Sequence, residues 1–484
     1  MLTMLGSPRR CCDGLTRRET LKAGALSALG GAFTLPHLLR AEEARRQPGR
    51  KARVKSVIAL YLLGGAGTQD MWDLKPNAPA EVRGEFKPIA SSVPGLQVCE
   101  HLPRLSKWMH RAALVRSVNH KAGCHNPLPS YSGYEATLSD ITTTKDTYPP
   151  SMGAICEYLK ASQGVPSPGD DFPAYVYLPC YLGWGTAIRY PGPYAGFLGK
   201  RYDPLFTECS PYVNHPPEKQ FEPQPLRGQP RIPNGVLADG ITLDRLNTRQ
   251  SLARQFDDRL REIEGQPASI AFDRYEQRAL SLLTSKKVKA AFDLDKVDPR
   301  LRDRYGRTLF GSSALIARQL IEAGTRFVNV SWDTFWERLK VQYEGWDTHH
   351  RNFPIYRDYN LPYFDLTCSA LLEDLDSRGL LDETLVIVLS EMGRTPKINP
   401  NGGRDHWTYC YTVFMAGGGL KGGAVYGASD AHAAYVKDRP VSTADICATV
   451  YECLGIDPTM PIRDYAGRPI PVAHGGKPIR EILA

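Results

Sequence analysis

The sequence of 484 residues is poor in several features that would assign it to a common class of protein. Its eleven cysteines include no Cys-x-x-Cys pair and no zinc-ribbon spacing, which excludes a structural zinc site of that kind. Two of them lie in the N-terminal leader, and at least one of the other nine stays a thiol if the rest pair. Beyond the leader no run is long and apolar enough to span a membrane, and no internal repeat is visible.

The net positive charge is confined to the N-terminal segment. The formal net charge is +8, but residues 1–55 are rich in Lys and Arg and contain few acids, so roughly the whole excess lies there. The remainder is near neutral, so a nucleic-acid partner has no electrostatic support. The hydrophobic share of 42% is ample for a sizeable core.

The N-terminal segment is predicted to be a targeting signal. Thr16–Lys22, with Arg17 and Arg18 adjacent, resembles the twin-arginine export signal, and a weakly apolar stretch broken by Pro36 follows. We therefore predict a signal segment over residues 1–44, a single domain over 45–484, and a periplasmic or secreted protein without a membrane span in the mature chain. The alternative is an ordinary amphipathic N-terminal helix.

The body of the chain is predicted to be an α/β fold. Residues 54–63 form a nearly continuous apolar run ending in Gly64 and Gly65, which is typical of a strand buried on both faces. Similar runs follow at 114–118, 174–178, 326–332, 384–390 and 411–416. Apolar residues repeat at helical spacing over 252–263, 314–323 and 363–378, the last ended by Gly379. This alternation predicts a mostly parallel sheet covered on both faces.

One stretch departs from this pattern. Residues from about 180 to 233 are dense in Pro, Gly and Tyr and show little periodicity. We predict a long surface excursion from the domain, serving as a lid or specificity region.

Polar residues follow the ends of the predicted strands, where ligands of an open parallel sheet bind. Asp70 comes after a glycine-rich turn that lets the backbone approach a ligand closely, although a tight turn with a solvated aspartate is the alternative. No Gly-Lys-Ser/Thr follows, which excludes a Walker loop. Asp347 and His349 are ligand types suited to zinc, manganese or magnesium, and the alternative is a surface histidine before a helix.

Two further segments complete the candidate site. Glu391 directly ends a buried strand, which is costly unless the carboxylate is paired or binds a cation. Arg394 could pair with it, leaving a purely structural ion pair, or with an anionic substrate. Asp405 and His406 follow two glycines and precede another predicted strand, and they offer a second pair of ligands.

Together these motifs resemble the bacterial domain of unknown function 1501 family, a branch of the alkaline phosphatase and sulfatase superfamily. The resemblance covers residues from about 57 to 457 and rests on four segments: Gly345–His349, Ser390–Pro396, Gly403–Trp407 and Gly417–Gly427. It implies an alkaline-phosphatase-like three-layer sandwich with a mostly parallel central sheet. It also implies a divalent metal (zinc, manganese, magnesium or calcium) and the candidate ligands Asp70, Asp347, His349, Glu391 and His406, to which Asp405 is added from its place beside His406.

The sequence departs from the superfamily pattern at two places. Met392 stands where the superfamily has a ligand histidine, which puts one metal position in doubt. The segment Gly123–Gly133 lies where sulfatases have Cys-x-Pro-x-Arg, yet no arginine follows. The available hydroxyl nucleophiles there are Ser130 and Ser132, and His120 and His125 are either ligands or plain loop histidines.

The expected function is metal-dependent hydrolysis of a phosphate or sulfate ester, with Arg394 or Arg404 steadying negative charge. The substrate would be an anionic ester such as a sulfated or phosphorylated glycan. The alternative is a non-catalytic protein of the same fold that binds a glycan or a protein partner. A periplasmic metal-dependent hydrolase of other bonds is a third possibility.

Overall fold

The structure is a computed structural model that describes residues 51–138, 140–162, 172–209, 226–233, 286–333 and 345–484. Contacts divide the chain into residues 1–51 and 52–484, and all described residues except Lys51 belong to the second unit. The predicted signal segment and the predicted helix at 252–263 lie outside the described residues. No helix in the described part is long and apolar enough to cross a lipid bilayer.

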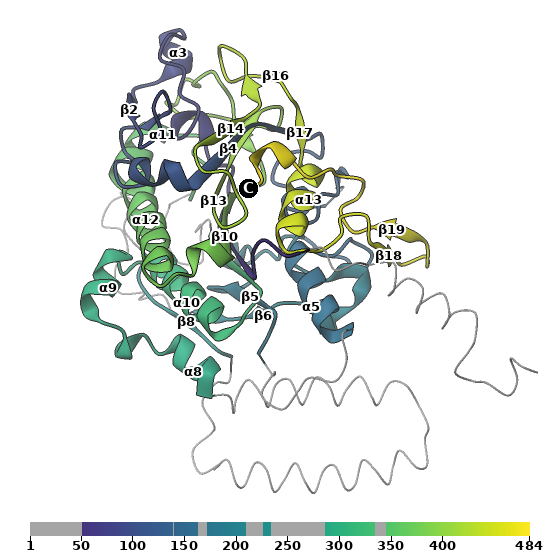
Figure 1. The fold of residues 1–484 in the computed structure, drawn as a ribbon. Helices are drawn as coiled ribbons and strands as arrows, with labels where there is room; N and C mark the ends of the chain where they lie inside the picture. Colours follow the sequence, from purple (N-terminus) through teal and green to yellow (C-terminus); the bar gives the residue numbers. More distant parts are fainter. Residues whose placement is uncertain (1–50, 139, 163–171, 210–225, 234–285, 334–344) are drawn as a thin grey trace, which may run out of the picture. The chain divides into compact units, whose positions relative to one another are not determined.

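A nine-stranded sheet forms the centre of this unit (Figure 1). Eight strands run in the order β14-β4-β13-β10-β1-β9-β5-β6, and β17 also pairs with β4. All are mutually parallel except β13, which is antiparallel to both β10 and β4. Their bounds are β1 Ser56–Leu62, β4 Ala112–Asn119, β5 Tyr175–Leu178, β6 Leu205–Phe206, β9 Phe327–Trp332, β10 Thr384–Leu389, β13 Tyr411–Gly417, β14 Ala424–Tyr426 and β17 Val441–Ser442.

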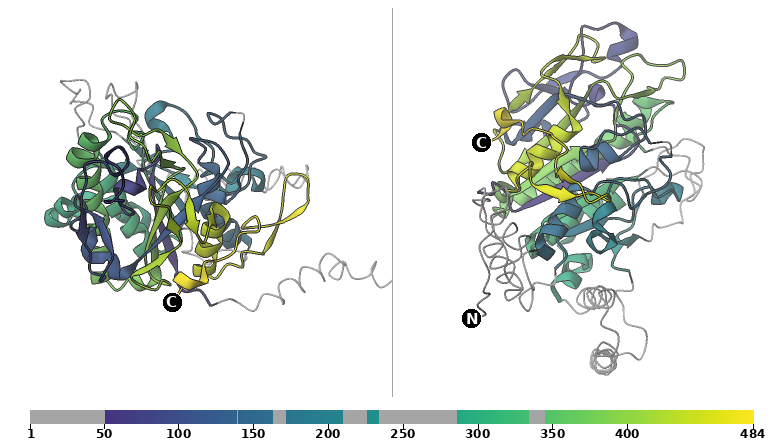
Figure 2. Two further views of the ribbon diagram at one scale, coloured as in Figure 1. Left: turned by 90° about the horizontal axis from the view of Figure 1, so that it is seen from above. Right: turned by 90° about the vertical axis from the view of Figure 1, so that its right-hand side faces the viewer.

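Helices cover both faces of the sheet, and Figure 2 shows the same layers from two other directions. The first face carries α10 (Leu309–Ala323) and α12 (Leu361–Ser377), with α8 (Lys286–Phe292) and α9 (Pro299–Arg304) packed on α10. The second carries α5 (Met152–Ser162), α13 (Thr443–Cys453) and the short α4 (Leu128–Ser132). The predicted mostly parallel sheet covered on both faces is confirmed.

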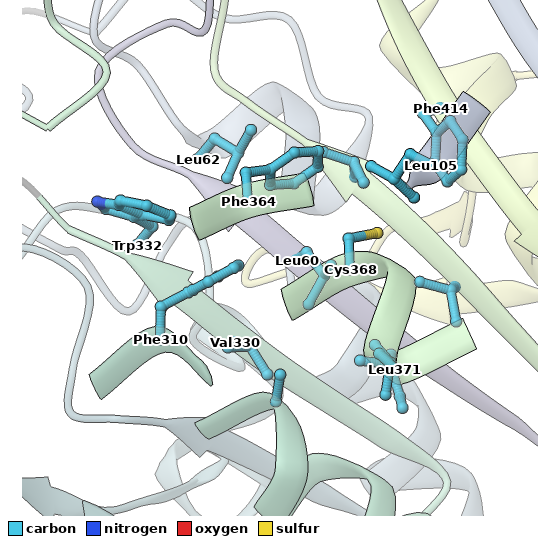
Figure 3. Close-up of a cluster of buried hydrophobic side chains, with 14 of the residues drawn as sticks. Leu60, Leu62, Leu105, Phe310, Val330, Trp332, Phe364, Cys368, Leu371 and Phe414 are labelled. Carbon is cyan, nitrogen blue, oxygen red and sulfur yellow. The ribbon is translucent and has the colours of Figure 1, made fainter. Parts of the chain in front are cut away.

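Side chains of β1 alternate between the two faces, as the period of two in a strand requires. Leu60 and Leu62 enter the cluster beneath α10 and α12, where they lie among Phe310, Trp332 and Phe364 (Figure 3). Their neighbours in sequence point into the second cluster, beneath α5 and α13. Each large apolar side chain buried in this way stabilises the fold by about 1.5–3 kcal/mol.

Smaller elements form outside the central sheet. Two-stranded sheets pair β2 (Pro88–Ala90) with β3 (Gln97–Cys99), β7 (Glu208–Cys209) with β8 (Pro230–Arg231), β11 (Gly393–Arg394) with β12 (His406–Trp407), β15 (Ala428–Ser429) with β16 (Val436–Asp438), and β18 (Pro461–Arg463) with β19 (Pro469–Pro471). Two short helices, α3 (Ala80–Arg83) and α11 (Asn352–Ile355), form in the connecting loops. The predicted excursion returns to the sheet at β6, which extends its edge beside β5.

Candidate metal centre

Several loops meet at one edge of the sheet because most of its strands run in the same direction. The carboxyl ends of β1, β4 and β10 lie at this edge, followed by Gly64, His125 and Glu391 in turn. The antiparallel strand β13 begins there, so His406 in the preceding β12 comes to the same edge. Segments far apart in sequence are thus brought together where an α/β sheet binds its ligands.

The turn after β1 needs glycine because it passes very close to the next loop. Gly64 has a φ of +116°, and a Cβ there would lie 2.5 Å from the Asp347 nitrogen. Without one, the Gly64 N–H donates to Glu391 Oε1 at 2.8 Å. The glycines singled out in the sequence therefore permit a close approach between three loops.

Asp347 is the hub of a cluster of imidazoles. Its side chain is only 5% exposed, and His349 Nε2 and His406 Nε2 lie 3.1 and 3.2 Å from its Oδ1. His125 Nε2 lies 3.2 Å from its Oδ2. The nitrogens His349 Nε2 and His406 Nε2 are 2.8 Å apart, so all three rings point their Nε2 atoms into one small space.

Two outer carboxylates orient two of these rings. His125 Nδ1 lies 3.2 Å from Glu391 Oε1, and His349 Nδ1 lies 2.8 Å from Asp405 Oδ1. An ionised carboxylate only accepts hydrogen bonds, so each Nδ1 carries the hydrogen. A histidine held by a carboxylate in this way presents its other nitrogen to a metal ion, as in many metal centres.

The pKa values follow this arrangement. Burial opposes a charge on His125, but hydrogen bonds to Asp347 and Glu391 raise its pKa to about 9. The hydrogen bond to Asp347 raises the pKa of His349, and burial lowers the pKa of His406. Although burial alone would favour the neutral acid, the three histidines and Arg394 hold the pKa of Asp347 far below its usual range. Asp347 is therefore an anion at any working pH.

His125 also has an unusual backbone. Its φ is +49°, in the left-handed region that a residue with a side chain seldom adopts. Such a conformation costs about 1–3 kcal/mol and persists only where the surroundings impose it, which is frequent at functional sites. From the sequence, His125 was either a ligand or a plain loop histidine. Ligands of a parallel sheet bind beyond the carboxyl ends of its strands, and applying this rule to β4 would have indicated His125 as a site residue.

The Arg394 side chain links several loops of the site through an ion pair and hydrogen bonds. Its side chain is completely buried and pairs with Asp347 Oδ1. Its remaining donors bind main-chain carbonyls of Gly64, Gly65, Trp346 and Arg404. It does not pair with the Glu391 side chain in the structure, and each of its three guanidinium nitrogens already donates to a protein oxygen.

Asp70 and Arg404 form a separate, buried pair. Arg404 donates to both oxygens of Asp70, and Asn352 Nδ2 donates to Oδ2 at 3.1 Å. The structure thus places Asp70 apart from the three imidazoles, and Asp70 neutralises the charge of Arg404. Asp405 lies at the rim and contacts the cluster through His349.

The two candidate hydroxyl nucleophiles lie inside α4. Ser130 Oγ donates to the Pro127 carbonyl at 2.8 Å, and Ser132 Oγ donates to the Leu128 carbonyl at 2.7 Å. Both serines are buried. Within the described part of the chain no hydrogen bond joins either hydroxyl to the imidazole cluster. Met392 is also fully buried, and a Cβ on Gly65 would lie 2.8 Å from its Cγ.

Three aromatic side chains, Trp407, Tyr409 and Tyr435, contact one another. Trp407 follows His406 directly, and its ring centroid lies 5.0 Å from Tyr409 and 5.6 Å from Tyr435. The two tyrosines are 50% and 54% exposed, whereas Trp407 is fixed by a 2.6 Å hydrogen bond to the Ala434 carbonyl. We call these three residues the aromatic trio.

The residues fit a divalent cation. His125, Asp347 and His406 each offer a ligand atom, and these atoms lie within 4.8 Å of one another. Two ligands of a tetrahedral zinc ion lie about 3.3 Å apart at ordinary Zn–N distances, close to the separations seen around Asp347. The fold and this cluster define an α/β protein with a candidate metal centre beyond the carboxyl ends of its sheet.

The chain belongs to the family described as protein of unknown function (DUF1501), whose model matches residues 54–483, so the resemblance seen in the sequence is confirmed. A search of curated proteins found no match.

Solved structures similar to the chain include a protein in the alkaline phosphatase superfamily from Vibrio parahaemolyticus, at a TM-score of 0.37 and 12% identity over 89% of this chain and 71% of that one. The PsFucS1 sulfatase from Pseudoalteromonas sp. has a TM-score of 0.37 and 12% identity, over 90% of this chain and 76% of the sulfatase chain. A phosphonate monoester hydrolase from Silicibacter pomeroyi has a TM-score of 0.33 and 12% identity, over 88% of this chain and 76% of the hydrolase chain. Similarity at this level does not extend to an activity.

Proposed function

We propose that the chain is a metal-dependent hydrolase of phosphate or sulfate esters whose ion is held by His125, Asp347 and His406. The observation that carries the proposal is the convergence of these three ligand atoms within 4.8 Å, from three separate loops at the carboxyl edge of the sheet. Convergence from distant segments requires the whole fold, so chance clustering of exposed groups is a poor explanation for it.

The ligand set narrows the choice of metal. Two imidazoles and one carboxylate suit zinc or manganese, whereas calcium and magnesium prefer a shell of oxygen atoms. Glu391 and Asp405, named as ligands from the sequence, are proposed here to orient His125 and His349 from behind. His349 is the natural fourth group, since its Nε2 faces that of His406.

A bound divalent ion would polarise the ester and lower the pKa of a coordinated water. In the overall reaction water adds to phosphorus or sulfur, the bond to the alcohol oxygen breaks, and that oxygen takes up a proton. Ser130 and Ser132 would have to leave their helix hydrogen bonds before either could attack, so water is the simpler nucleophile.

The aromatic trio supports a glycan as the organic part of the ester. Sugar rings stack their C–H faces on exposed aromatic rings, and phenolic hydroxyls bind sugar hydroxyls. Tyr409 and Tyr435 offer both features, and they contact Trp407, the residue after the proposed metal ligand His406. The same trio favours the second candidate function, a non-catalytic glycan-binding protein, if the centre proves inert. We keep export to the periplasm or beyond, by the twin-arginine route, as part of the proposal.

Turnover of generic phosphate and sulfate esters separates the two functions. The test compares the wild type with His406→Gln, and with His432→Gln as a matched control on an exposed histidine. Activity that needs added zinc or manganese, falls at least 100-fold in His406→Gln and persists in His432→Gln would support the hydrolase. Trace activity that is equal in all three proteins would contradict it.

A further inference from the structure

Two cysteines lie together at the edge of the sheet beside β5. Strands β5 and β6 are parallel, with Val176 opposite Leu205 and Tyr177 opposite Phe206. The two chains stay adjacent beyond these pairs, because Thr207 Oγ1 donates to the Pro179 carbonyl at 2.7 Å. Cys180 and Cys209 come next along the two chains, and their side chains are hydrogen-bonded to each other.

The environment of this pair differs from that of the other cysteines. Burial raises the thiol pKa at seven other described cysteines: Cys99, Cys124, Cys156, Cys368, Cys410, Cys447 and Cys453. Cys180 shows the opposite shift, since the hydrogen bond with Cys209 lowers its pKa, with a smaller contribution from Arg189. Cys180 and Cys209 are both partly exposed, so an oxidant can reach them. A thiolate that is accessible and beside a second cysteine is the arrangement that disulfide exchange requires.

We propose that Cys180 and Cys209 form a disulfide once the chain meets an oxidising compartment. The Cys180 thiolate attacks a sulfur of an oxidant disulfide, either that of a dithiol oxidase or glutathione disulfide, and displaces one thiolate. Cys209 then loses its proton and attacks the mixed disulfide at the Cys180 sulfur, displacing the second. Two protons and two electrons leave the protein pair, and the oxidant becomes two thiols.

This bond would close residues 181–208 into a loop that is tied to the carboxyl edge of the sheet. Gly183 N–H donates to Asp333 Oδ2 at 2.8 Å, just beyond the end of β9. Tyr190 has its pKa raised to about 12, first by burial and then by the charges of Asp333, Glu391 and Asp347. The disulfide would therefore anchor the base of a segment that reaches the carboxyl edge of the sheet. It goes beyond the proposed hydrolysis and does not depend on it.

Peptide mapping of the full chain tests the proposal. The protein is equilibrated with glutathione disulfide in one sample and with dithiothreitol in another, its remaining thiols are alkylated, and it is digested without reduction. We expect a cross-linked peptide pair containing Cys180 and Cys209 in the first sample, lighter by two hydrogens than the sum of the two reduced peptides, and none in the second. The oxidised wild type should also melt at a higher temperature than the reduced one.

Controls come from single substitutions. Cys180→Ser should lose both the cross-linked peptide and the rise in melting temperature, whereas Cys410→Ser at a buried cysteine outside the pair should keep both. The wild-type map stands even if a variant fails to fold. Alkylation of both cysteines after the glutathione disulfide treatment would overturn the proposal, as would a separate glutathione adduct on each or a bond from either to a different cysteine.

Discussion

Asp70 and Arg404 form a bidentate ion pair, with Arg404 Nε 2.8 Å from Oδ2 and Nη2 2.8 Å from Oδ1. Both side chains are at most 2% exposed. Arg404 also donates to the carbonyls of Val82 and Thr395. The pair therefore joins the turn after β1 to the loop that leads into His406, and so it stabilises the loops around the candidate centre.

Asp70→Asn should destabilise the protein without emptying the centre. Removing one partner of a buried ion pair leaves an uncompensated charge, which costs about 3–5 kcal/mol of unfolding free energy. Urea denaturation measures this loss, and Asp438→Asn, at an exposed aspartate, should change stability by less than about 0.5 kcal/mol. A variant that is as stable as the wild type but has lost its metal would show instead that Asp70 is a ligand.

Gly403→Ala should disturb the centre by collision. A Cβ on Gly403 would lie 2.0 Å from the His349 carbonyl oxygen, so the loop carrying His349 must move. Gly402→Ala is the matched control, because a Cβ there meets nothing within 4 Å although the φ of Gly402 is +66°. We expect Gly403→Ala to weaken zinc binding at least tenfold in a titration, and Gly402→Ala to cost only about 1–2 kcal/mol of stability. Equal zinc affinity in the two variants would contradict the assignment of His349 to the centre.

His474 should make the protein less stable as the pH falls. Burial lowers its pKa to about 4, so the native state keeps it neutral while the unfolded chain takes up a proton near pH 6.5. Stability from this group is therefore fully present above pH 6.5 and is lost as the pH drops toward 4. The variant His474→Asn, whose residue tolerates the φ of +50°, should lose less stability between pH 7 and pH 5. Parallel urea midpoints for both proteins across that range would disprove the link.

The aromatic trio should contribute to substrate binding. Tyr435→Ala removes a 54% exposed ring from the trio, and one aromatic contact is worth about 0.5–1.5 kcal/mol, or roughly a threefold to tenfold change in affinity. We expect KM for a sulfated or phosphorylated oligosaccharide to rise by this factor with kcat unchanged. Tyr465→Ala, at an exposed tyrosine outside the trio, is the control and should leave KM as it is. An identical KM in Tyr435→Ala would remove the trio from the proposal.

Much of the fold could be predicted from the sequence. The six apolar runs are all strands of the central sheet, because a strand covered on both faces must be apolar along its whole length. Strands β6, β14 and β17 were not predicted, since they are only two, three and two residues long. They pair with β5 at one side of the sheet and with β4 at the other.

The site was predictable only in part. The strand-end rule and the motifs indicated Asp347, His349 and His406, which the structure brings together. Side-chain partners could not be read from spacing. Arg394 lies three residues from Glu391 in sequence, yet its charge goes to Asp347, 47 residues away. The position of the His125 ring could not be read from the local sequence, because its left-handed φ of +49° persists only where the surroundings impose it.

Metal stoichiometry shows directly whether His125, Asp347 and His406 hold a divalent ion. The measurement is elemental analysis by mass spectrometry of the full chain, purified at neutral pH without chelator, beside His406→Gln and His432→Gln. We predict about one zinc or manganese ion per chain in the wild type and in His432→Gln, and far less in a folded His406→Gln protein. A folded wild-type protein that holds no stoichiometric ion, and takes none up from added zinc or manganese, would contradict this prediction.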